Sequence, residues 1–430
     1  MAKKRKRRLK KSVKRGCALI VAVPILVYLF FLVKDLNVFK GLKDFPDFQD
    51  HAPATEQPAD LAEMTQRLDR LFHSPQRLDT TRIAIEVRDI ASGNLVFSRN
   101  AYRLAPPASC MKLLTAVTAM HLLGTDHQYT TEVITRGEQR GHTFHGIVLL
   151  QLDNDPMVES LEPLVDAIRR QGITHIEGDI ELRLMRDDTL RAHSSAATWD
   201  IPYHRLPILL KGRGHIEQDL KYMLQRKGIT LSRQPITDQN LPTRTIYLHQ
   251  TPLTDVLAPM LIHSSNIKAD GLFYHIGRKC QQLPFIELSE GDWLLSEAAL
   301  IDHDYAWQNF VVNDGSGLSP DNRLTAHFLV QLLQYAWADE GMRHVLIDQA
   351  LATPAHPIRH GSLLGRMSAP MFRNRIFVKT GTLTTIGLSS LAGYAKGADG
   401  RWYAFAIINE DSPVAESRIF QDQVCRELVR

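Results

Sequence analysis

A serine and a lysine, two residue types that together can perform nucleophilic chemistry, lie three positions apart at Ser109 and Lys112. Residues at positions i and i+3 share a face of an α-helix, so the hydroxyl and the amine can meet. Two prolines precede the pair and an apolar run continues after it until Gly124, which predicts that the serine opens a buried helix. Burial disfavours a charged lysine, so a neutral amine could act as the base that activates the serine.

Taken alone, this pair also has an ordinary explanation. A Ser-x-x-Lys sequence arises by chance about once per few hundred residues, and Ser265 and Lys268 form a second one. A serine at a helix start with a lysine that extends its amine to solvent would account for either pair. The choice between the two interpretations therefore depends on motifs elsewhere in the chain.

Two such motifs occur downstream in order. The first is Ser264-Ser265-Asn266 at the end of a predicted helix, and the second is Lys379-Thr380-Gly381-Thr382 on a predicted strand. The three motifs in this order resemble the serine acyl-transferase set shared by penicillin-binding proteins and serine β-lactamases. Further matches resemble the class C low-molecular-mass penicillin-binding proteins, the D-alanyl-D-alanine carboxypeptidase/endopeptidase family. These matches are Pro107–Ala116, Leu123-Gly124, Asp155-Pro156, Gly172-Ile173, Ile176-x-Gly178, Asn313–Ser319, Gly361-Ser362-Leu363 and Lys379–Leu383.

The resemblance implies a catalytic role for five residues. Ser109 would attack the carbonyl of the penultimate D-alanine while Lys112 accepts its proton. Ser264 would relay protons toward the leaving amine, and Asn266 would offer its amide group to the substrate peptide. Lys379 would add a second positive charge.

The same resemblance assigns the substrate-binding strand. The backbone N–H groups of Ser109 and Thr382 would bind the oxyanion, and Gly381 would let the substrate backbone lie close to the strand. Lys379, helped by the hydroxyls of Thr380 and Thr382, is expected to bind the carboxylate of the residue that leaves. The expected partners are peptidoglycan stem peptides and β-lactam antibiotics.

Two alternatives to a carboxypeptidase remain open. A β-lactamase would need a means of activating the deacylating water, and no Glu-x-x-x-Asn motif of the class A type lies between Ser264 and Lys379. A non-catalytic peptidoglycan-binding scaffold would need no pair of nucleophile and base, whereas this sequence keeps both.

The distribution of charge bears on partners and location. Ten of the 51 Lys and Arg residues fall within residues 1–16, and none of the 47 Asp and Glu residues do. The remainder of the chain is mildly acidic, which argues against a nucleic-acid-binding body. Residues 17–33 are uncharged and apolar, so we expect a basic cytoplasmic tail, a short membrane-spanning anchor, and a catalytic body outside the inner membrane, in the periplasm. Residues 34–60 would form the stalk.

The cysteines and histidines indicate neither a disulfide framework nor a metal site. The sequence contains only four cysteines, and Cys110 lies inside the nucleophile motif. Cys280 and Cys425 could pair in an oxidising compartment, although two buried thiols are the simpler interpretation. The 18 histidines lack zinc-type spacing, so we expect no metal and no cofactor.

The pattern of elements predicts an α+β fold. Alternating strands at both ends of the chain suggest one antiparallel sheet flanked by helices, the arrangement of β-lactamases and transpeptidases. Residues 61–127 and 246–430 would form this catalytic domain, with Thr245–Leu248 rejoining the main sheet. Residues 128–245 are expected to form an inserted α/β domain between the first and second motifs. Ser264 follows Ser109 by only 155 residues, an interval shorter than the double insertion typical of the family.

Overall fold

The computed structural model describes residues 59–73, 78–185, 187, 189–191, 203–238, 240–281 and 310–430, all within one compact unit that begins at Gln57. The expected basic tail and membrane anchor lie outside the described residues. So does the expected stalk, except for its last two positions, which open helix α2 (Ala59–His73). Among the helices that are described, none is both long and apolar enough to cross a membrane.

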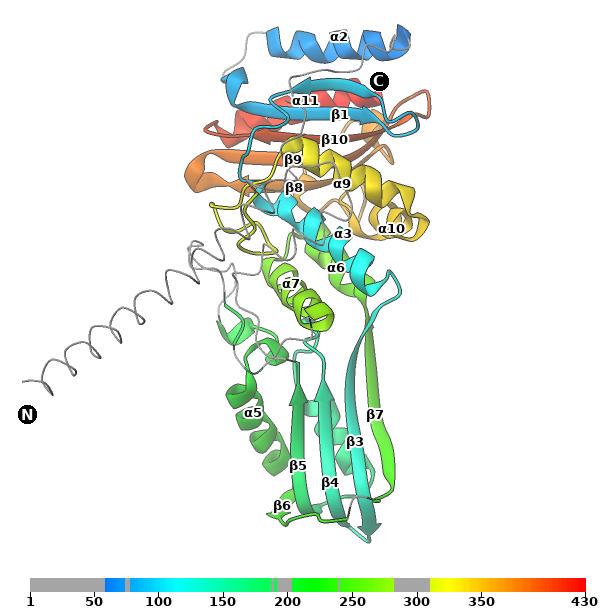
Figure 1. Ribbon diagram of the computed structural model, residues 1–430, viewed down its shortest axis with the longest axis vertical. Coiled ribbons are helices and arrows are strands. Elements are labelled where there is room, and N and C mark those ends of the chain that lie inside the picture. Colours follow the sequence, from blue (N-terminus) through cyan, green and yellow to red (C-terminus); the bar gives the residue numbers. More distant parts are fainter. Residues whose placement is uncertain are drawn as a thin grey trace, which may run out of the picture. The chain divides into compact units, whose positions relative to one another are not determined.

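The catalytic domain is built on one antiparallel sheet whose strands come from the two ends of the described chain (Figure 1). The strand order is β2-β1-β10-β9-β8, which confirms the predicted sheet. Its strands are β1 (Ile83–Asp89), β2 (Leu95–Arg99), β8 (Ile376–Leu383), β9 (Leu388–Lys396) and β10 (Trp402–Asn409). Strand β10 lies at the centre, where Val87 of β1 is opposite Phe405.

The two faces of this sheet bury different apolar clusters. On β1, Ile83, Ile85 and Val87 pack into a cluster with residues of α2 and α11 (Val414–Val429). Successive side chains of a strand point to opposite faces, so Ala84 joins the other cluster. Figure 1 shows α2 and α11 on one side of the sheet and α3 (Met111–Leu123) and α9 (Ala326–Ala338) on the other.

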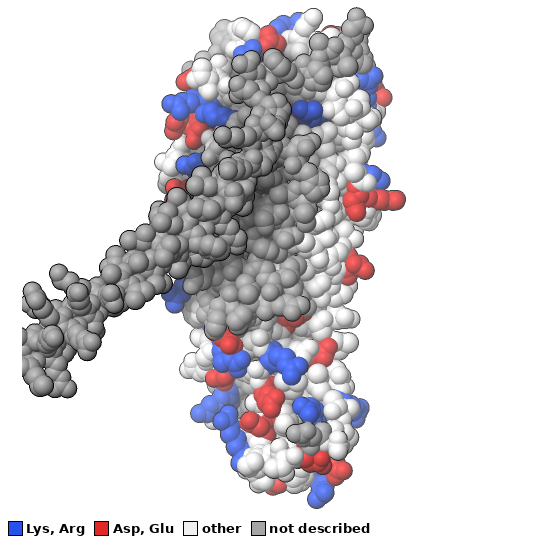
Figure 2. All heavy atoms as spheres, viewed as in Figure 1, with Lys and Arg blue, Asp and Glu red and all other residues white. Residues whose placement is uncertain are grey.

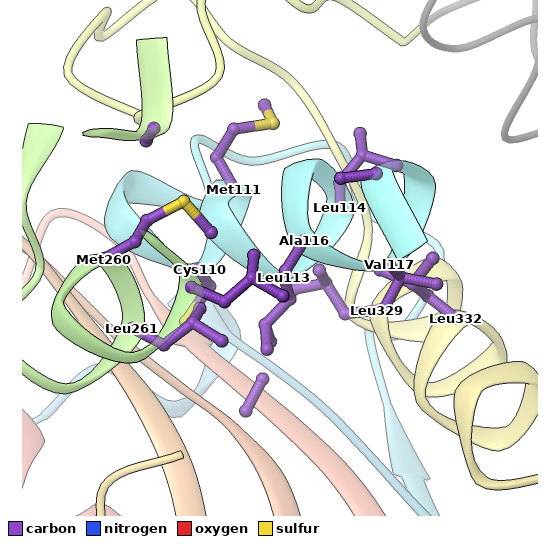
Figure 3. Packing of buried hydrophobic residues seen from close by; sticks show 14 of the residues in the cluster. Cys110, Met111, Leu113, Leu114, Ala116, Val117, Met260, Leu261, Leu329 and Leu332 are labelled. Atoms are coloured by element: carbon purple, nitrogen blue, oxygen red, sulfur yellow. The ribbon is translucent and has the colours of Figure 1, made fainter. Parts of the chain in front are cut away.

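Helix α3 is the central helix of the second cluster. Its first ten residues are all buried, and Gly124 ends it with a φ of 91°, as the sequence predicts. Figure 3 shows its apolar side chains between those of α6 (Leu253–Ile262) and α9. Burying one such leucine contributes roughly 1.5–3 kcal/mol, so many contacts fix the position of this helix. The residues labelled in that view are Cys110, Met111, Leu113, Leu114, Ala116, Val117, Met260, Leu261, Leu329 and Leu332.

The inserted domain contains a second sheet, in the order β6-β5-β4-β3-β7. Its strands are β3 (Gln128–Arg140), β4 (Thr143–Leu152), β5 (His175–Leu184), β6 (Thr230–Arg233) and β7 (Thr243–Pro252). Strands β4, β5 and β6 run parallel to one another, while β3 is antiparallel to β4 and β7. Helices α4 (Glu162–Arg170) and α5 (Arg213–Arg226) supply apolar side chains to its core.

One sequence-based prediction about this insertion is wrong. Thr245–Leu248 does not rejoin the catalytic sheet, because β7 pairs with β3 from Thr243 to Pro252. The inserted domain therefore continues past residue 245, and α6 begins directly after β7 at Leu253. A short alternating run identifies a strand but carries no information about which sheet it joins.

Short helices and turns complete the described chain. Helix α7 (Asn266–Gln281) follows α6, and α10 (Glu340–His344) continues into a π-helical turn, Val345–Ala350. Single 3₁₀ turns occur at Thr80–Arg82, Ala108–Cys110, Tyr203–Arg205, Ile208–Leu210, Gly361–Leu363, Pro370–Phe372 and Thr384–Ile386.

On the face shown in Figure 2, the coloured surface of the inserted domain carries Lys and Arg interspersed with Asp and Glu. That described face therefore lacks the continuous basic patch of a nucleic-acid-binding surface.

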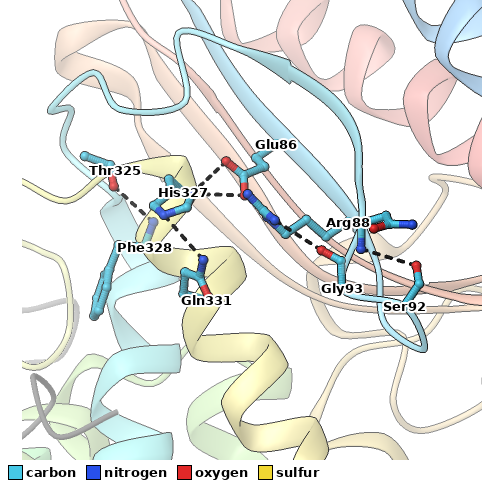
Figure 4. Close-up of polar contacts among 9 residues, drawn as sticks. Glu86, Arg88, Ser92, Gly93, Thr325, His327, Phe328 and Gln331 are labelled. Atoms are coloured by element: carbon cyan, nitrogen blue, oxygen red, sulfur yellow. Dashed lines mark hydrogen bonds and ion pairs between the residues drawn. The ribbon is translucent and has the colours of Figure 1, made fainter. Parts of the chain in front are cut away.

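A buried carboxylate connects the sheet to α9 (Figure 4). Glu86 on β1 is 1% exposed, and Nδ1 of His327 lies 3.0 and 2.9 Å from its two oxygens. Arg88 Nε donates to the same carboxylate at 2.6 Å. Burial alone would raise the pKa of Glu86, but the hydrogen bonds and charges of His327 and Arg88 outweigh it and hold this pKa below its usual range. The backbone N–H of His327 also donates to Ala101, which lies on the segment that leads to Ser109.

We therefore expect Glu86→Gln to lower the free energy of unfolding at pH 7 by about 1–3 kcal/mol, because His327 and Arg88 lose a buried carboxylate. The pKa of Glu86 is depressed in the folded state, so its stabilisation is present above the unfolded pKa and is lost as the pH falls through the folded value. Urea unfolding at pH 7 and at acidic pH measures both effects.

A matched control is Glu63→Gln, which removes the exposed carboxylate that pairs with Arg67 on α2 at 2.9 Å. Exposed pairs contribute little, so this variant should change the stability by less than about 1 kcal/mol. A loss for Glu86→Gln no greater than that of the control, or a loss that stays constant with pH, would contradict the prediction.

Candidate active site

Ser109 lies in the 3₁₀ turn Ala108–Cys110, which runs directly into α3. Ala108 has a φ of 45°, in the left-handed region that residues with a Cβ rarely occupy. Gly317, with a φ of 76°, packs against this turn, and a Cβ there would lie 1.7 Å from the carbonyl oxygen of Ala108. Only glycine permits this approach, so the Gly317 loop fixes the backbone that carries the nucleophile.

The amine of Lys112 is fully buried among three polar groups. Its Nζ lies 3.1 Å from Ser109 Oγ, 2.7 Å from Asn266 Oδ1 and 2.6 Å from the carbonyl oxygen of Ser316. The contact with Asn266 joins the first motif to the second across 154 positions of sequence. Because a lysine ammonium only donates, the amide oxygen of Asn266 must face it, and the amide NH₂ group is then directed elsewhere.

Asp314 holds the loop that receives Lys112. Its buried carboxylate accepts hydrogen bonds from the backbone N–H groups of Ser316, Gly317 and Ser319 at 3.1, 2.5 and 2.7 Å. These bonds orient the carbonyl of Ser316 toward the lysine amine. In the sequence, Asn313–Ser319 is only one of the matches to the family, and the structure adds a direct contact with the expected base.

Lys379 on β8 is the second buried lysine of the site. Its Nζ donates to Ser264 Oγ at 2.9 Å and to the carbonyl oxygen of Thr380 at 2.7 Å. Burial, followed by the nearby charge of Lys112, lowers the pKa of Lys379 to about 7. Ser264 lies between α6 and α7 with a φ of 59°, a strained conformation for serine that presents its hydroxyl to this amine.

The outer edge of β8 is the candidate substrate-binding strand. Ala352 and Val378 exchange backbone hydrogen bonds of 3.1 and 2.8 Å on the side away from β9. Backbone groups two residues apart point the same way, so the N–H groups of Thr380 and Thr382 also face this outer side. Gly381 faces the nucleophile turn, where a Cβ would lie 3.0 Å from the Cβ of Ala108 and 2.2 Å from Ser390 Oγ.

The structure brings the predicted residues together in two neighbouring groups. Lys112 links Ser109 to Asn266, and Lys379 links Ser264 to β8. The groups are coupled electrostatically, because the charge of Lys112 acts on the pKa of Lys379. Thr380, Gly381 and Thr382 follow Lys379 along the edge strand of the sheet.

In the competing pair, Ser265 has the ordinary role of a serine at the start of a helix. Ser265 Oγ lies 3.5 Å from the backbone nitrogen of Lys268, at the start of α7. Burial lowers the pKa of Lys268, and the charge of Asp155 opposes this shift. Cys425 is likewise a buried free thiol, and the side chain of Cys280 lies outside the described residues.

Three contacts at the site are not predicted as functional from the sequence. Besides the carbonyl of Ser316, the hydroxyl of Ser362 contacts the hydroxyl of Thr380, and Arg418 Nη2 donates to Thr382 Oγ1 at 3.1 Å. Ser362 belongs to the segment Gly361-Ser362-Leu363, which resembles the family and could have been assigned on that basis. Arg418 lies in a C-terminal helix with no motif around it, so no sequence signal marks it.

This chain belongs to the D-Ala-D-Ala carboxypeptidase 3 (S13) family, whose family model matches residues 64–204 and 210–427. A D-alanyl-D-alanine carboxypeptidase of Actinomadura sp. (strain R39) is 22% identical over 482 residues, which cover 88% of this chain and 86% of the relative. The family is one of serine peptidases, and the chain is therefore a hydrolase of the penicillin-binding class.

Solved structures confirm the fold. The crystal structure of penicillin binding protein 4 (dacB) from Haemophilus influenzae matches with a TM-score of 0.64 at 19% identity, covering 85% of this chain and 98% of the other. The same protein complexed with a novel β-lactam matches with a TM-score of 0.61 at 18% identity, over the same shares of the two chains.

The lowered pKa of Lys379 leads to a prediction about stability. Between pH 7 and the ordinary lysine pKa, the unfolded chain binds a proton that the folded chain does not, so stability rises with pH across this window. Lys379→Met should therefore raise the free energy of unfolding at pH 7, by about 1–4 kcal/mol, and the advantage should shrink as the pH approaches 10. Urea unfolding at pH 7 and pH 9.5 measures the change.

Lys221→Met, at an exposed position of α5, is the matched control and should show no such gain. The prediction is contradicted if Lys379→Met is no more stable than the wild type at pH 7, or if its advantage grows with pH. Burial of the Lys379 amine would then not destabilise the folded protein.

Proposed function

We propose that this protein cleaves D-alanyl-D-alanine and related peptide bonds of peptidoglycan stem peptides through a covalent acyl-enzyme, as a serine-type carboxypeptidase/endopeptidase. One observation carries this proposal: a fully buried lysine amine lies 3.1 Å from the hydroxyl of Ser109 and is held there by Asn266 and Ser316. This is hydrogen-bonding distance for a base that takes the proton of a nucleophile. A scaffold that only binds peptide would not need to bury this amine.

The reaction would proceed in two halves. Ser109 Oγ attacks the carbonyl of the penultimate D-alanine while Lys112, in its neutral form, takes the hydroxyl proton. The oxyanion forms near the N–H groups of Ser109 and Thr382. The C–N bond then breaks, and the Lys379 ammonium donates a proton through Ser264 Oγ to the leaving amine. Water then attacks the resulting ester and gives a proton to Lys379 through Ser264. Lys112 returns its proton to Ser109 Oγ as the ester C–O bond breaks, which frees the serine and the shortened peptide.

The two lysines suit these proton transfers because both are buried and the charge of Lys112 acts on Lys379. With a pKa of about 7, Lys379 exists as a mixture of amine and ammonium near neutral pH, so it can both accept and return a proton. Its bond to Ser264 Oγ gives the proton a path toward the leaving group. Asn266, whose amide oxygen faces Lys112, would direct its NH₂ group to a carbonyl of the substrate.

β-Lactam antibiotics would acylate the same serine, because a strained lactam carbonyl replaces the scissile amide. The Haemophilus influenzae relative complexed with a β-lactam supports this extension to the present chain. A β-lactamase would form the same acyl-enzyme but would release the hydrolysed drug quickly, so persistence of the drug adduct separates the two activities.

We further propose that residues 17–33 anchor the protein in the inner membrane with the catalytic body in the periplasm. The basic residues that precede this uncharged stretch support a cytoplasmic N-terminus. Peptidoglycan lies outside the membrane, so this orientation would place the active site on the side of its substrate. The anchor itself lies outside the described residues.

Ser109→Ala should abolish labelling by fluorescent penicillin and the release of D-alanine from purified peptidoglycan fragments, because no nucleophile remains beside Lys112. Mass spectrometry of the fragments shows whether terminal D-alanine is lost or cross-linked peptides are separated. Ser265→Ala, at the middle position of the second motif, should retain labelling and serves as the control. Continued labelling of Ser109→Ala, or fragments left unchanged by the wild type, would overturn the proposed function.

Deleting residues 1–58 should release a soluble protein that still binds penicillin, because every proposed catalytic residue lies beyond that point. The full-length chain should sediment with membranes and keep its N-terminal residues on sequencing. A mature chain that begins beyond Val33 and stays in the soluble fraction would refute the anchor.

A further inference from the structure

We propose that the guanidinium of Arg418 is the positive group that binds the C-terminal carboxylate of the substrate, at the end of the substrate-binding strand. This inference rests on the proposed function, and it moves a role that the sequence suggested for Lys379 to a different residue. It makes Arg418 a determinant of specificity for peptides that end in a free carboxylate.

The position of Arg418 carries the proposal. It lies one turn into α11, and its Nη2 donates to Thr382 Oγ1 at 3.1 Å. The side chain is exposed, and no carboxylate among the described residues forms an ion pair with it. The neighbouring carboxylate, Asp422, is engaged by Arg366 at 2.6 Å. Arg366 also donates to the backbone oxygen of Arg418 at 3.3 Å, which braces this turn of the helix without occupying the guanidinium.

The side chains along β8 provide the rest of the site. Thr380 and Thr382 are two residues apart, so their side chains project from the same face of the strand. Because Arg418 donates to Thr382 Oγ1, that oxygen is an acceptor and the hydroxyl proton is left to donate. A carboxylate placed here would accept from this hydroxyl and from further N–H groups of the guanidinium, the planar fork that suits a carboxylate.

Lys379 is less suited to the same role. Its amine is completely buried, and both Ser264 Oγ and the carbonyl of Thr380 already accept from it. Burial, followed by the charge of Lys112, lowers its pKa to about 7, and Cys110 opposes this shift. An amine that loses its proton near neutral pH also loses the positive charge that attracts a carboxylate, whereas an exposed guanidinium stays charged. This division leaves Lys379 free for proton transfer.

The test compares peptides ending in D-alanyl-D-alanine with a free carboxylate and with a terminal amide, using the full-length protein. In the wild type, kcat/KM for the free acid should exceed that for the amide about ten- to hundredfold, as expected for charge-assisted hydrogen bonds. Arg418→Gln should reduce this ratio about tenfold or more, and Arg418→Lys should restore only part of it, because an ammonium keeps the charge but not the fork.

Arg426→Gln is the matched control, since Arg426 is another exposed arginine of α11, two turns further along. This variant should keep the wild-type ratio. The wild-type ratio should also persist from pH 6 to pH 9. If Lys379 bound the carboxylate instead, this ratio would fall as the pH rises above 7. Thermal melting of Arg418→Gln shows whether the fold is intact.

The outcomes separate the inference from the function on which it rests. If the wild type cleaves neither peptide, the proposed function fails. If the wild type prefers the free acid but Arg418→Gln keeps the same ratio, or lowers the rates for both peptides equally, then Arg418 has only a structural role and the inference is overturned. A preference for the free acid that disappears above pH 7 would indicate that Lys379, and not Arg418, binds the carboxylate.

Discussion

Two lysine amines buried in one site are the constraint on which the rest of the structure depends. Lys112 and Lys379 are both inaccessible to water, and the charge of one lowers the pKa of the other. A buried ammonium is costly unless hydrogen-bond acceptors surround it, so the surrounding acceptors are a requirement of the fold as well as of the chemistry. The carbonyl of Ser316 and the amide oxygen of Asn266 meet this requirement for Lys112.

Several parts of the catalytic domain hold those acceptors in place. The carboxylate of Asp314 binds the backbone of its own loop, so the carbonyl of Ser316 is fixed before substrate arrives. Gly317 allows that loop to pack against the strained turn at Ala108. Helix α3 is buried around nearly its whole circumference, and the close packing of its side chains against α6 and α9 fixes the direction of Lys112.

How far the sequence can predict this structure depends on how local each signal is. The buried helix after Ser109 is predicted by an apolar run, its end by Gly124, and the antiparallel sheet by alternating strands. The three motifs contain Ser109, Lys112, Ser264, Asn266 and Lys379. The partner sheet of β7 could not be predicted, because strand pairing is decided by tertiary contacts. Arg418 could not be predicted for the same reason, since its contact with the end of β8 arises only from the packing of α11.

The edge strand β8 is covered on its outer side along one part and open along the next. An unpaired sheet edge invites association with other chains, and proteins usually cover it. Here the edge is covered at Val378 by the bridge to Ala352, while no described strand pairs with the outer side of Thr380–Thr382. An extended peptide bound at this open part would add to the sheet through its backbone. Polar side chains from Ser362 and Arg418 reach this open part from two other segments, so the side chains that border it come from outside the strand as well as from it.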